Sequence, residues 1–363
     1  MRIAIVGAGA IGCSLAGPLS ARGHDVTLVG RPAQVEAIQR DGLTLVDPHG
    51  LLRRYRLDAV TALAQRPDLV LLTVKTQDVA AACAGLLPIA QGVPVVAMQN
   101  GVRGDHLAAD VLGHEAVSGA VVMSAAMYLE PGVVTVQFPG WLIVGEPFGP
   151  VGARTHMIAR VLRGALPTYV TRHLERVRWS KLISNLNNAL CAATGLALPA
   201  LMRRPNGVPL ALRVMREGCA VARAVGIRLD HGLYGLSPRA LVRDPTAALI
   251  ALLQSGVTTV LTALPERAAL AVLSAASRSR LNQLPIRGST WQSIRRGRPS
   301  EIAYLNGEIV RLGSERGVPT PYNARLVAVV GTVEATRRFV PLDDLFPAAA
   351  ATAPAYHTTT AGA

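Results

Sequence analysis

A glycine-rich turn at the start of the chain constrains the fold more than any other feature. Residues 2–6 form a short, mostly apolar run that is typical of a buried strand, and Gly7-Ala8-Gly9-Ala10-Ile11-Gly12 follows it directly. In such a strand–turn–helix unit the first glycine permits the tight turn, the second lets a pyrophosphate approach the backbone, and the third allows close helix–strand packing. The helix N-terminus then faces the anion. We therefore predict a dinucleotide site that includes Gly7, Gly9, Ala10, Ile11 and Gly12.

The end of the second predicted strand, at residues 25–29, indicates which dinucleotide binds. NAD sites usually carry Asp or Glu at this point, where the carboxylate binds the ribose 2′-hydroxyl. This chain has Val29-Gly30-Arg31-Pro32 and no acid. The guanidinium of Arg31 can offer a planar pair of donors to a 2′-phosphate, which predicts NADP(H) as the cofactor. The alternative is that Arg31 is a solvated loop residue.

The remaining pattern divides the chain into an α/β half and a helical half. Apolar strands that alternate with helices indicate a parallel sheet covered on both faces. These strands are expected at residues 69–74, 94–99, 117–127, 132–138, 141–144 and 168–170, with helices at 78–87 and 153–162. Later helices are expected at 179–194, 210–225, 246–264 and 300–316, the last with Ser300 as its N-cap. We predict a Rossmann-type α/β domain over 1–172, an all-α domain over 173–345, and a disordered tail over 346–363.

Composition and charge argue against several classes of function. The net charge is +14, but the basic residues are mostly scattered and aromatic residues make up only 4%, which disfavours a nucleic-acid partner. The uncharged stretch 247–264 contains too many polar residues for a membrane span, and the histidines are isolated, so no metal site is expected. No cysteine belongs to a C-x-x-C motif, which predicts buried reduced thiols in a cytoplasmic protein.

Only two of the 37 basic residues are lysines, Lys75 and Lys181. Arginine keeps its proton, whereas lysine can release one, so either the two lysines carry proton chemistry or they survived by chance. Lys75 and Asn100 follow two predicted strands at the sheet edge that lines a ligand crevice. On a single helix, Lys181, Asn185 and Asn188 would share one face, which favours a site over a solvated polar stripe.

Together these segments resemble the ketopantoate reductase family. The resemblance spans residues 1–335 and rests on the glycine motif, Lys75, Gln99-Asn100-Gly101, Trp179-Ser180-Lys181-Leu182-Ile183-Ser184-Asn185, and Ser289 followed by Glu301-Ile302-Ala303-Tyr304-Leu305-Asn306-Gly307. It implies a Rossmann-type domain joined to an all-α C-terminal domain similar to that of 6-phosphogluconate dehydrogenase. It also implies NADPH-dependent reduction of 2-dehydropantoate to pantoate, a step toward pantothenate and coenzyme A.

The resemblance implies a role for individual residues as well. Lys181 matches the general acid, Glu301 a substrate-orienting carboxylate, and Ser289 a serine that binds the substrate carboxylate. Positions beside the substrate or the nicotinamide are matched by Asn100, Asn185 and Lys75. Lys181 would then protonate the C2 oxygen of a 2-oxo acid as hydride arrives from the nicotinamide. The acid at position 301 also has a structural explanation, because a carboxylate in the first turn of a helix is favourable.

Two positions depart from the family pattern. The second helix asparagine usually lies eight residues after the lysine, where this chain has Ala189 and Asn188 comes one residue early. Ser293 replaces an aspartate that is common four residues after the serine. Two alternatives therefore stay open: a reductase of the same mechanism acting on another small 2-oxo acid or ketone, and an NADPH-sensing protein without catalysis. The sequence also leaves the oligomeric state open, a homodimer included.

Overall fold

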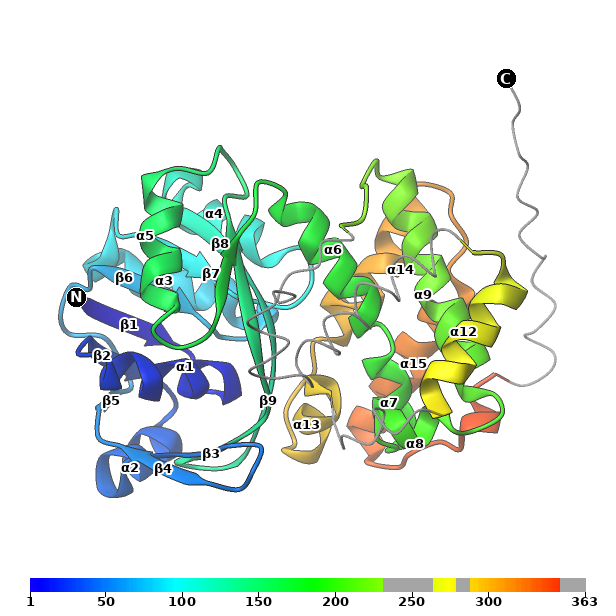
Figure 1. Cartoon of the computed structure of the whole chain (residues 1–363), viewed down its shortest axis with the longest axis horizontal. Helices are drawn as coiled ribbons and strands as arrows, with labels where there is room; N and C mark the ends of the chain where they lie inside the picture. The colour runs from blue at the N-terminus through cyan, green and yellow to red at the C-terminus, as the bar shows by residue number, and fades with distance from the viewer. Residues whose placement is uncertain (231–263, 279–287, 347–363) are drawn as a thin grey trace.

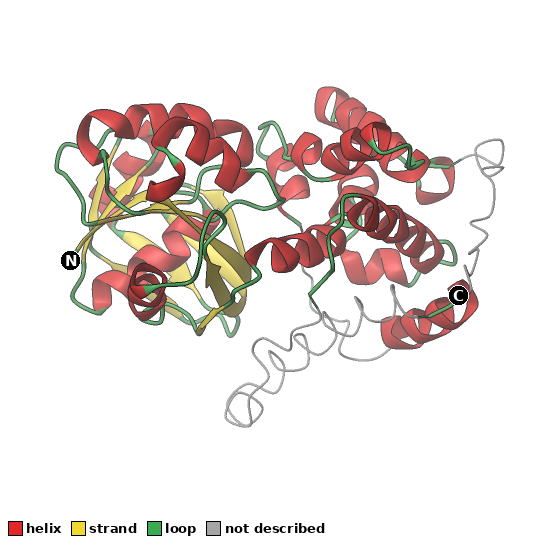
Figure 2. Cartoon of the chain, turned by 90° about the horizontal axis from the view of Figure 1, so that it is seen from above, coloured by secondary structure: helices red, strands yellow, loops and turns green. Residues whose placement is uncertain are grey.

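The computed structural model describes residues 1–230, 264–278 and 288–346, which form two lobes (Figure 1). One lobe contains the strands together with covering helices, and the other contains helices only, as Figure 2 shows from above. The predicted fold class, a Rossmann-type α/β part followed by an all-α part, is confirmed. Within the part of the chain that is described, no helix is long and apolar enough to cross a membrane.

The sheet lobe is built on ten strands in the order β4-β3-β9-β8-β7-β6-β1-β2-β5, with β10 paired to β9. The strands are β1 Arg2–Val6, β2 Asp25–Val29, β3 Leu43–Val46, β4 Leu52–Tyr55, β5 Asp58–Val60, β6 Leu69–Leu72, β7 Val95–Ala97, β8 Val117–Glu130, β9 Val133–Gly145 and β10 Thr168–Val170. From β5 to β8 every neighbouring pair is parallel. The strand order reverses between β1 and β6, and in such sheets the ligand crevice lies at the carboxyl ends of these strands.

Alternation along β1 shows why both faces of the sheet are covered. Ile3 and Ile5 belong to a core shared with α1 (Ala10–Ala21) and α5 (Ala153–Leu162). Ala4 and Val6 point to the opposite face and join a second core. That core includes side chains of α3 (Val79–Ala90) and α4 (Gly104–Leu112). The same lobe also contains α2 (Pro32–Asp41). The four cysteines Cys13, Cys83, Cys191 and Cys219 are buried and free, as predicted.

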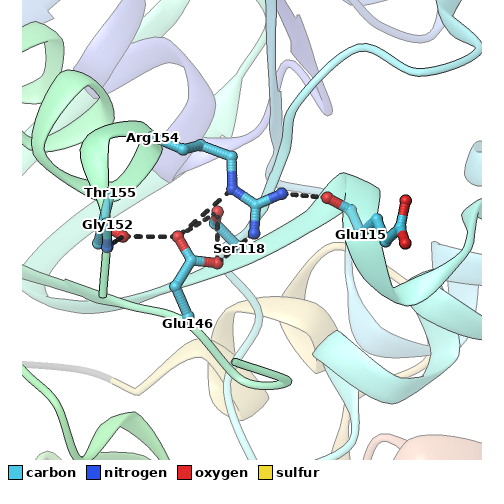
Figure 3. Close-up of polar contacts among 6 residues, drawn as sticks. All are labelled: Glu115, Ser118, Glu146, Gly152, Arg154 and Thr155. Carbon is cyan, nitrogen blue, oxygen red and sulfur yellow. Dashed lines mark hydrogen bonds and ion pairs between the residues drawn. The ribbon is translucent and has the colours of Figure 1, made fainter. Parts of the chain in front are cut away.

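A buried carboxylate fastens α5 to the sheet (Figure 3). Glu146, just after β9, accepts hydrogen bonds from Ser118 Oγ on β8 at 3.0 Å and from Thr155 Oγ1 at 2.7 Å. It also pairs with the guanidinium of Arg154, which donates to the carbonyl oxygen of Glu115. The negative charge lies beside the N-terminal turn of α5, where the helix dipole favours it. Glu146 is therefore fully engaged as part of the framework.

The helical lobe packs around one apolar core that contains Leu182, Leu186, Val214 and Val330. Its helices are α6 Leu174–Asn185, α7 Asn188–Thr194, α8 Leu198–Met202, α9 Gly207–Ala224, α12 Glu266–Arg278, α13 Ser289–Arg295, α14 Asn306–Glu315 and α15 Pro321–Thr336. In Figure 1, α6 lies where the two lobes meet. The predicted helix at 246–264 and the tail beyond Phe346 lie almost wholly outside the described residues. Phe346 itself packs against Tyr322, with ring centroids 5.0 Å apart.

Four predicted elements differ from the structure by more than their ends. The single helix expected over 179–194 is wrong, because α6 ends at Asn185 and α7 begins at Asn188. The helix expected over 300–316 is a 3₁₀ turn at Ile302–Tyr304 followed by α14. The prediction of Ser300 as N-cap is wrong, since Glu301 precedes the turn and Leu305 precedes α14; Ser300 Oγ instead accepts from the N–H of Ile302 at 3.2 Å. The two strands expected at 132–138 and 141–144 form one strand, β9, with a bulge near its middle.

Gly140 makes that continuous strand possible, which gives a stability prediction. It has φ +60°, and a Cβ there would lie 1.9 Å from the Met123 carbonyl oxygen. Gly132 has φ +80°, but its Cβ would meet Ala37 only at 3.4 Å. Gly132→Ala should cost roughly 1–2 kcal/mol, the ordinary penalty of left-handed backbone. Gly140→Ala should cost about 1–3 kcal/mol more through overpacking. Denaturant unfolding of both variants checks this, and equal losses would contradict it.

Candidate active site

The glycine turn after β1 has the geometry that a bound dinucleotide requires. Gly7 has φ +117°, and a Cβ there would lie 2.5 Å from the backbone nitrogen of Val74. A Cβ on Gly12 would lie 2.2 Å from the carbonyl oxygen of Gly7. A Cβ on Gly9 would meet nothing within 4 Å. The protein's own packing thus explains two of the glycines, while Gly9 keeps the backbone open on the side from which a pyrophosphate would approach.

Ala10 and Ile11 open α1 directly behind this turn. The N-cap residue is Gly9, which has no side chain to cap the helix, so the first N–H groups are available to a ligand anion. Arg31 follows β2, where it is exposed and lies 3.8 Å from Asp78. The donors of the site therefore fit the phosphates of a dinucleotide.

Lys181 lies at the junction of the two lobes. Its Nζ donates a hydrogen bond of 2.7 Å to Oδ1 of Asn100, which follows β7 in the sheet lobe. Although part of the side chain stays accessible, burial of the ammonium lowers the pKa of Lys181 to about 7. The nearby charge of Arg178 lowers this pKa further, and the charge of Glu301 opposes the shift. The predicted lysine is thus able to gain and lose a proton near neutral pH.

Arg178, one turn before Lys181 on α6, ties the lobes together. It forms a two-point ion pair with Asp105, with N···O distances of 2.6 Å, and both side chains are almost fully buried. It also donates to the carbonyl oxygens of Ala97 and Gln99 at 2.9 and 3.0 Å. These bonds fix α6 against the end of β7, which is where Asn100 begins the next turn.

Glu301 contacts the sheet lobe at Thr76. Its Oε1 accepts from the backbone N–H of Thr76 at 3.1 Å and lies 3.0 Å from the Thr76 hydroxyl. Its charge acts on both Lys181 and Lys75, so the carboxylate lies near both ammonium groups. Among the described residues, both hydrogen bonds to the Glu301 carboxylate reach Oε1, which leaves Oε2 for a ligand.

Lys75 closes the remaining side. Its Nζ donates to Oγ of Ser293 on α13, and that hydroxyl donates to the carbonyl oxygen of Ser289 at 3.0 Å. Burial lowers the pKa of Lys75. The Cγ atom of Asn188 lies 2.7 Å from where a Cβ on Gly288 would be, which places Asn188 next to Ser289.

Asn185 and Asn188 still meet, although the helix between them is broken. Nδ2 of Asn188 lies 3.5 Å from Oδ1 of Asn185. The break is stabilised by Asn306, whose Nδ2 donates to the carbonyl oxygen of Leu186 at 3.1 Å and to Oδ1 of Asn323 at 2.9 Å. The amide of Asn323 in turn donates to the buried carboxylate of Glu217 and to the carbonyl oxygen of Val214.

The structure therefore brings most of the predicted polar site residues to the interface of the lobes. They are Lys75, Asn100, Lys181, Asn185, Asn188, Ser289 and Glu301. Arg31 lies apart from them, beside the glycine turn. Sequence reasoning missed Thr76, Arg178 and Asn306. Arg178 gave no distinct signal, because α6 carries three other charged residues, Glu175, Arg176 and Lys181.

Comparisons with known proteins identify the family to which the chain belongs. A family model described as Ketopantoate reductase PanE/ApbA matches residues 3–148, and one described as Ketopantoate reductase PanE/ApbA C terminal matches residues 173–334. The chain belongs to the ketopantoate reductase family. It is therefore an oxidoreductase of that family, and the sensing alternative without catalysis loses its support.

Individual members of the ketopantoate reductase family are similar over nearly the whole chain. The 2-dehydropantoate 2-reductase of Pyrococcus horikoshii is 28% identical over 340 residues, which is 92% of this chain and 98% of the relative. A solved PanE/ApbA family ketopantoate reductase from Ralstonia eutropha JMP134 is 31% identical and has a TM-score of 0.73. The match covers 93% of this chain and 99% of that chain. D-mandelate dehydrogenase, solved with NADH and anilino(oxo)acetate, shares the fold at a TM-score of 0.74 and 21% identity, with 93% of this chain and 99% of that chain covered.

The low pKa of Lys181 gives a direct prediction. Because Lys75 and Lys181 are the only lysines, ¹³Cε-lysine labelling yields two side-chain NMR signals, and Lys75→Arg leaves one. We expect that signal to titrate with a midpoint near pH 7. Ordinary lysines titrate near about 10.4. A midpoint above about 9 would show that the ammonium is not desolvated as described.

Proposed function

We propose that this protein reduces 2-dehydropantoate to pantoate with NADPH, and that Lys181 donates the proton. The observation that carries the proposal is the hydrogen bond between Lys181 and Asn100, because it joins the titratable amine of one lobe to the nucleotide-binding lobe. The pKa of Lys181, about 7, suits a group that must be protonated before the reaction and deprotonated after it.

The glycine turn and α1 would hold the pyrophosphate, and Arg31 the 2′-phosphate. When bound, NADPH supplies the hydride that reduces the C2 carbonyl. Lys75 and Asn100, at the ends of β6 and β7, would border the nicotinamide and its ribose on the substrate side. Closure of the lobes around this point would exclude water from the reaction.

The remaining residues would position the substrate. Negative charge builds on the carbonyl oxygen during reduction, and Lys181 stabilises and then protonates that oxygen. Ser289 would bind the carboxylate, with Asn188 next to it in the fold and the amide of Asn185 beside that of Asn188. Oε2 of Glu301 would accept a hydrogen bond from the distal hydroxyl of the substrate, since Thr76 holds Oε1 in position.

A second candidate substrate class is another small 2-oxo acid or ketone. The observation that favours it is the contact between Lys75 and Ser293. A hydroxyl carries no charge, so α13 does not compensate the ammonium of Lys75 as an aspartate at position 293 would. A panel of 2-oxo acids at fixed NADPH separates the two candidates. The highest kcat/KM with 2-dehydropantoate supports the first, and a clearly higher value with another acid replaces it.

Substitution of Lys181 tests the chemistry. Single-turnover oxidation of NADPH should slow by about 100-fold or more in Lys181→Ala, the usual size of a general-acid contribution, with NADPH affinity unchanged. In the natural enzyme the reduction rate should fall as pH rises through 7, because only the ammonium form donates a proton. Lys181→Arg keeps the charge and should be slow without that pH dependence. An undiminished rate in either variant contradicts the assignment.

The choice of cofactor gives a separate prediction. We expect kcat/KM to be higher with NADPH than with NADH. Arg31→Ala should lower kcat/KM at least about tenfold with NADPH only, since one charged hydrogen bond is worth roughly 1.5–3 kcal/mol. Arg22→Ala is a matched control, because its exposed side chain lies at the opposite end of α1. A preference for NADH in the unmodified enzyme would refute the role of Arg31.

A further inference from the structure

Arg296 and Arg298 extend from a rigid turn of the helical lobe. α13 ends just before Arg296, and the chain turns through Gly297, which has φ +68°. The N–H of Gly297 donates to the carbonyl oxygen of Ile294 at 3.1 Å, and the N–H of Arg298 to that of Ser293 at 2.9 Å. This pair of bonds is a Schellman motif, in which glycine is preferred at the left-handed position. The backbone that carries the two guanidinium groups is therefore fixed.

The turn lies over the sheet lobe and is attached to it on both sides. Nε2 of Gln292 donates to the carbonyl oxygen of Ala126 at 3.2 Å, and Nε2 of Gln77 to that of Pro299 at 3.4 Å. Between these contacts the guanidinium carbon of Arg296 lies 3.9 Å from the ring centroid of Tyr128, a buried residue of β8. A guanidinium stacked on an aromatic face keeps its N–H edges free for an anion.

Arg31, at the end of β2, faces the same region. Burial raises the pKa of Tyr128, and the charges of Arg296, Arg31 and Arg298 oppose that rise. Burial lowers the pKa of Arg296, and both Arg298 and Arg31 lower it further. Arg296 thus stacks on the ring of Tyr128, and Arg31 and Arg298 are close enough for their charges to act on that ring.

Their charges are poorly compensated within the described part of the chain. There, neither Arg296 nor Arg298 has a carboxylate at ion-pair distance, and Arg31 has only Asp78 at 3.8 Å. An exposed pair of that kind contributes little. Like charges held close together repel, and a doubly charged anion between them would turn this repulsion into attraction.

The position of the three arginines identifies the anion. Gly30, next to Arg31, packs on the glycine turn, since a Cβ on Gly30 would lie 2.6 Å from that of Ala8. We propose that Arg296 and Arg298 bind the 2′-phosphate of NADPH together with Arg31, so that the helical lobe takes part in selecting the cofactor. The inference rests on the proposed function, which assigns NADPH but gives the phosphate to Arg31 alone.

Binding of nucleotide fragments tests this without catalysis. Adenosine 2′,5′-bisphosphate and 5′-AMP differ only in the 2′-phosphate, and isothermal titration in a phosphate-free buffer measures both. Arg296→Ala and Arg298→Ala should each weaken binding of the bisphosphate by roughly tenfold or more. The affinity for 5′-AMP should change by less than about twofold. Arg295→Ala is the matched control, because it removes one neighbouring charge whose guanidinium lies over Trp291 instead. Its affinities should stay unchanged.

Each outcome decides between the two proposals. If the unmodified protein does not prefer the bisphosphate, the NADPH assignment and this inference both fail. If Arg31→Ala removes the preference but Arg296→Ala and Arg298→Ala behave like Arg295→Ala, only the inference fails. Equal losses for both nucleotides would also overturn it, since they would reflect general charge. Inorganic phosphate that binds as tightly as the bisphosphate would indicate a free-anion site instead.

A variant that keeps every charge separates geometry from electrostatics. Gly297→Ala strains the left-handed position and displaces the turn, while Arg296 and Arg298 remain. We expect the same selective loss for the bisphosphate in this variant. An unchanged preference for the bisphosphate would show that the fixed turn does not present the arginines to it.

Discussion

The buried ion pair between Arg178 and Asp105 is the contact on which the site depends. Removing two charges from water is costly, and only close two-point geometry with further hydrogen bonds offsets that cost. Here the carbonyl oxygens at the end of β7 supply those bonds, and Gly119 leaves the space, since a Cβ there would lie 2.8 Å from the Asp105 carboxylate. Because Lys181 lies one turn away on the same helix, this pair also sets how that amine meets Asn100.

The same contact connects architecture with proton chemistry. Docking of α6 on the sheet lobe removes water from the Lys181 ammonium and places the Arg178 charge nearby, and both effects lower the pKa of Lys181. An arginine at position 181 would stay charged in these surroundings. This is a physical reason for a lysine in a chain where nearly every other basic residue is arginine. The composition of the chain therefore points to the same lysine that the structure places at the junction of the lobes.

Local sequence patterns predicted the elements that are determined by their own residues. β1, β2 and α5 have the predicted bounds, because continuous apolar runs and clear helix periodicity define them. The strands β3 and β4 escaped prediction, since they are short and β4 is exposed and carries arginines. The break after α6 could not be read from its own sequence either. Asn306, far along the chain, provides the amide that satisfies the carbonyl oxygen freed there.

Prediction of the site residues shows the same division between local patterns and contacts with distant parts of the chain. Strand ends and the glycine turn predicted Lys75, Asn100 and the proposed cofactor site, because parallel sheets place such residues at one edge. In the sequence, Arg296 and Arg298 form a short basic run with Arg295, and no local motif assigns a function to them. Folding places that run against β8 and within reach of Arg31, a relation that no local pattern contains.

If both lobes hold the same phosphate, the free energy of cofactor binding also favours the closed arrangement in which Lys181 meets Asn100. Cofactor selection and assembly of the proton donor would then be one event.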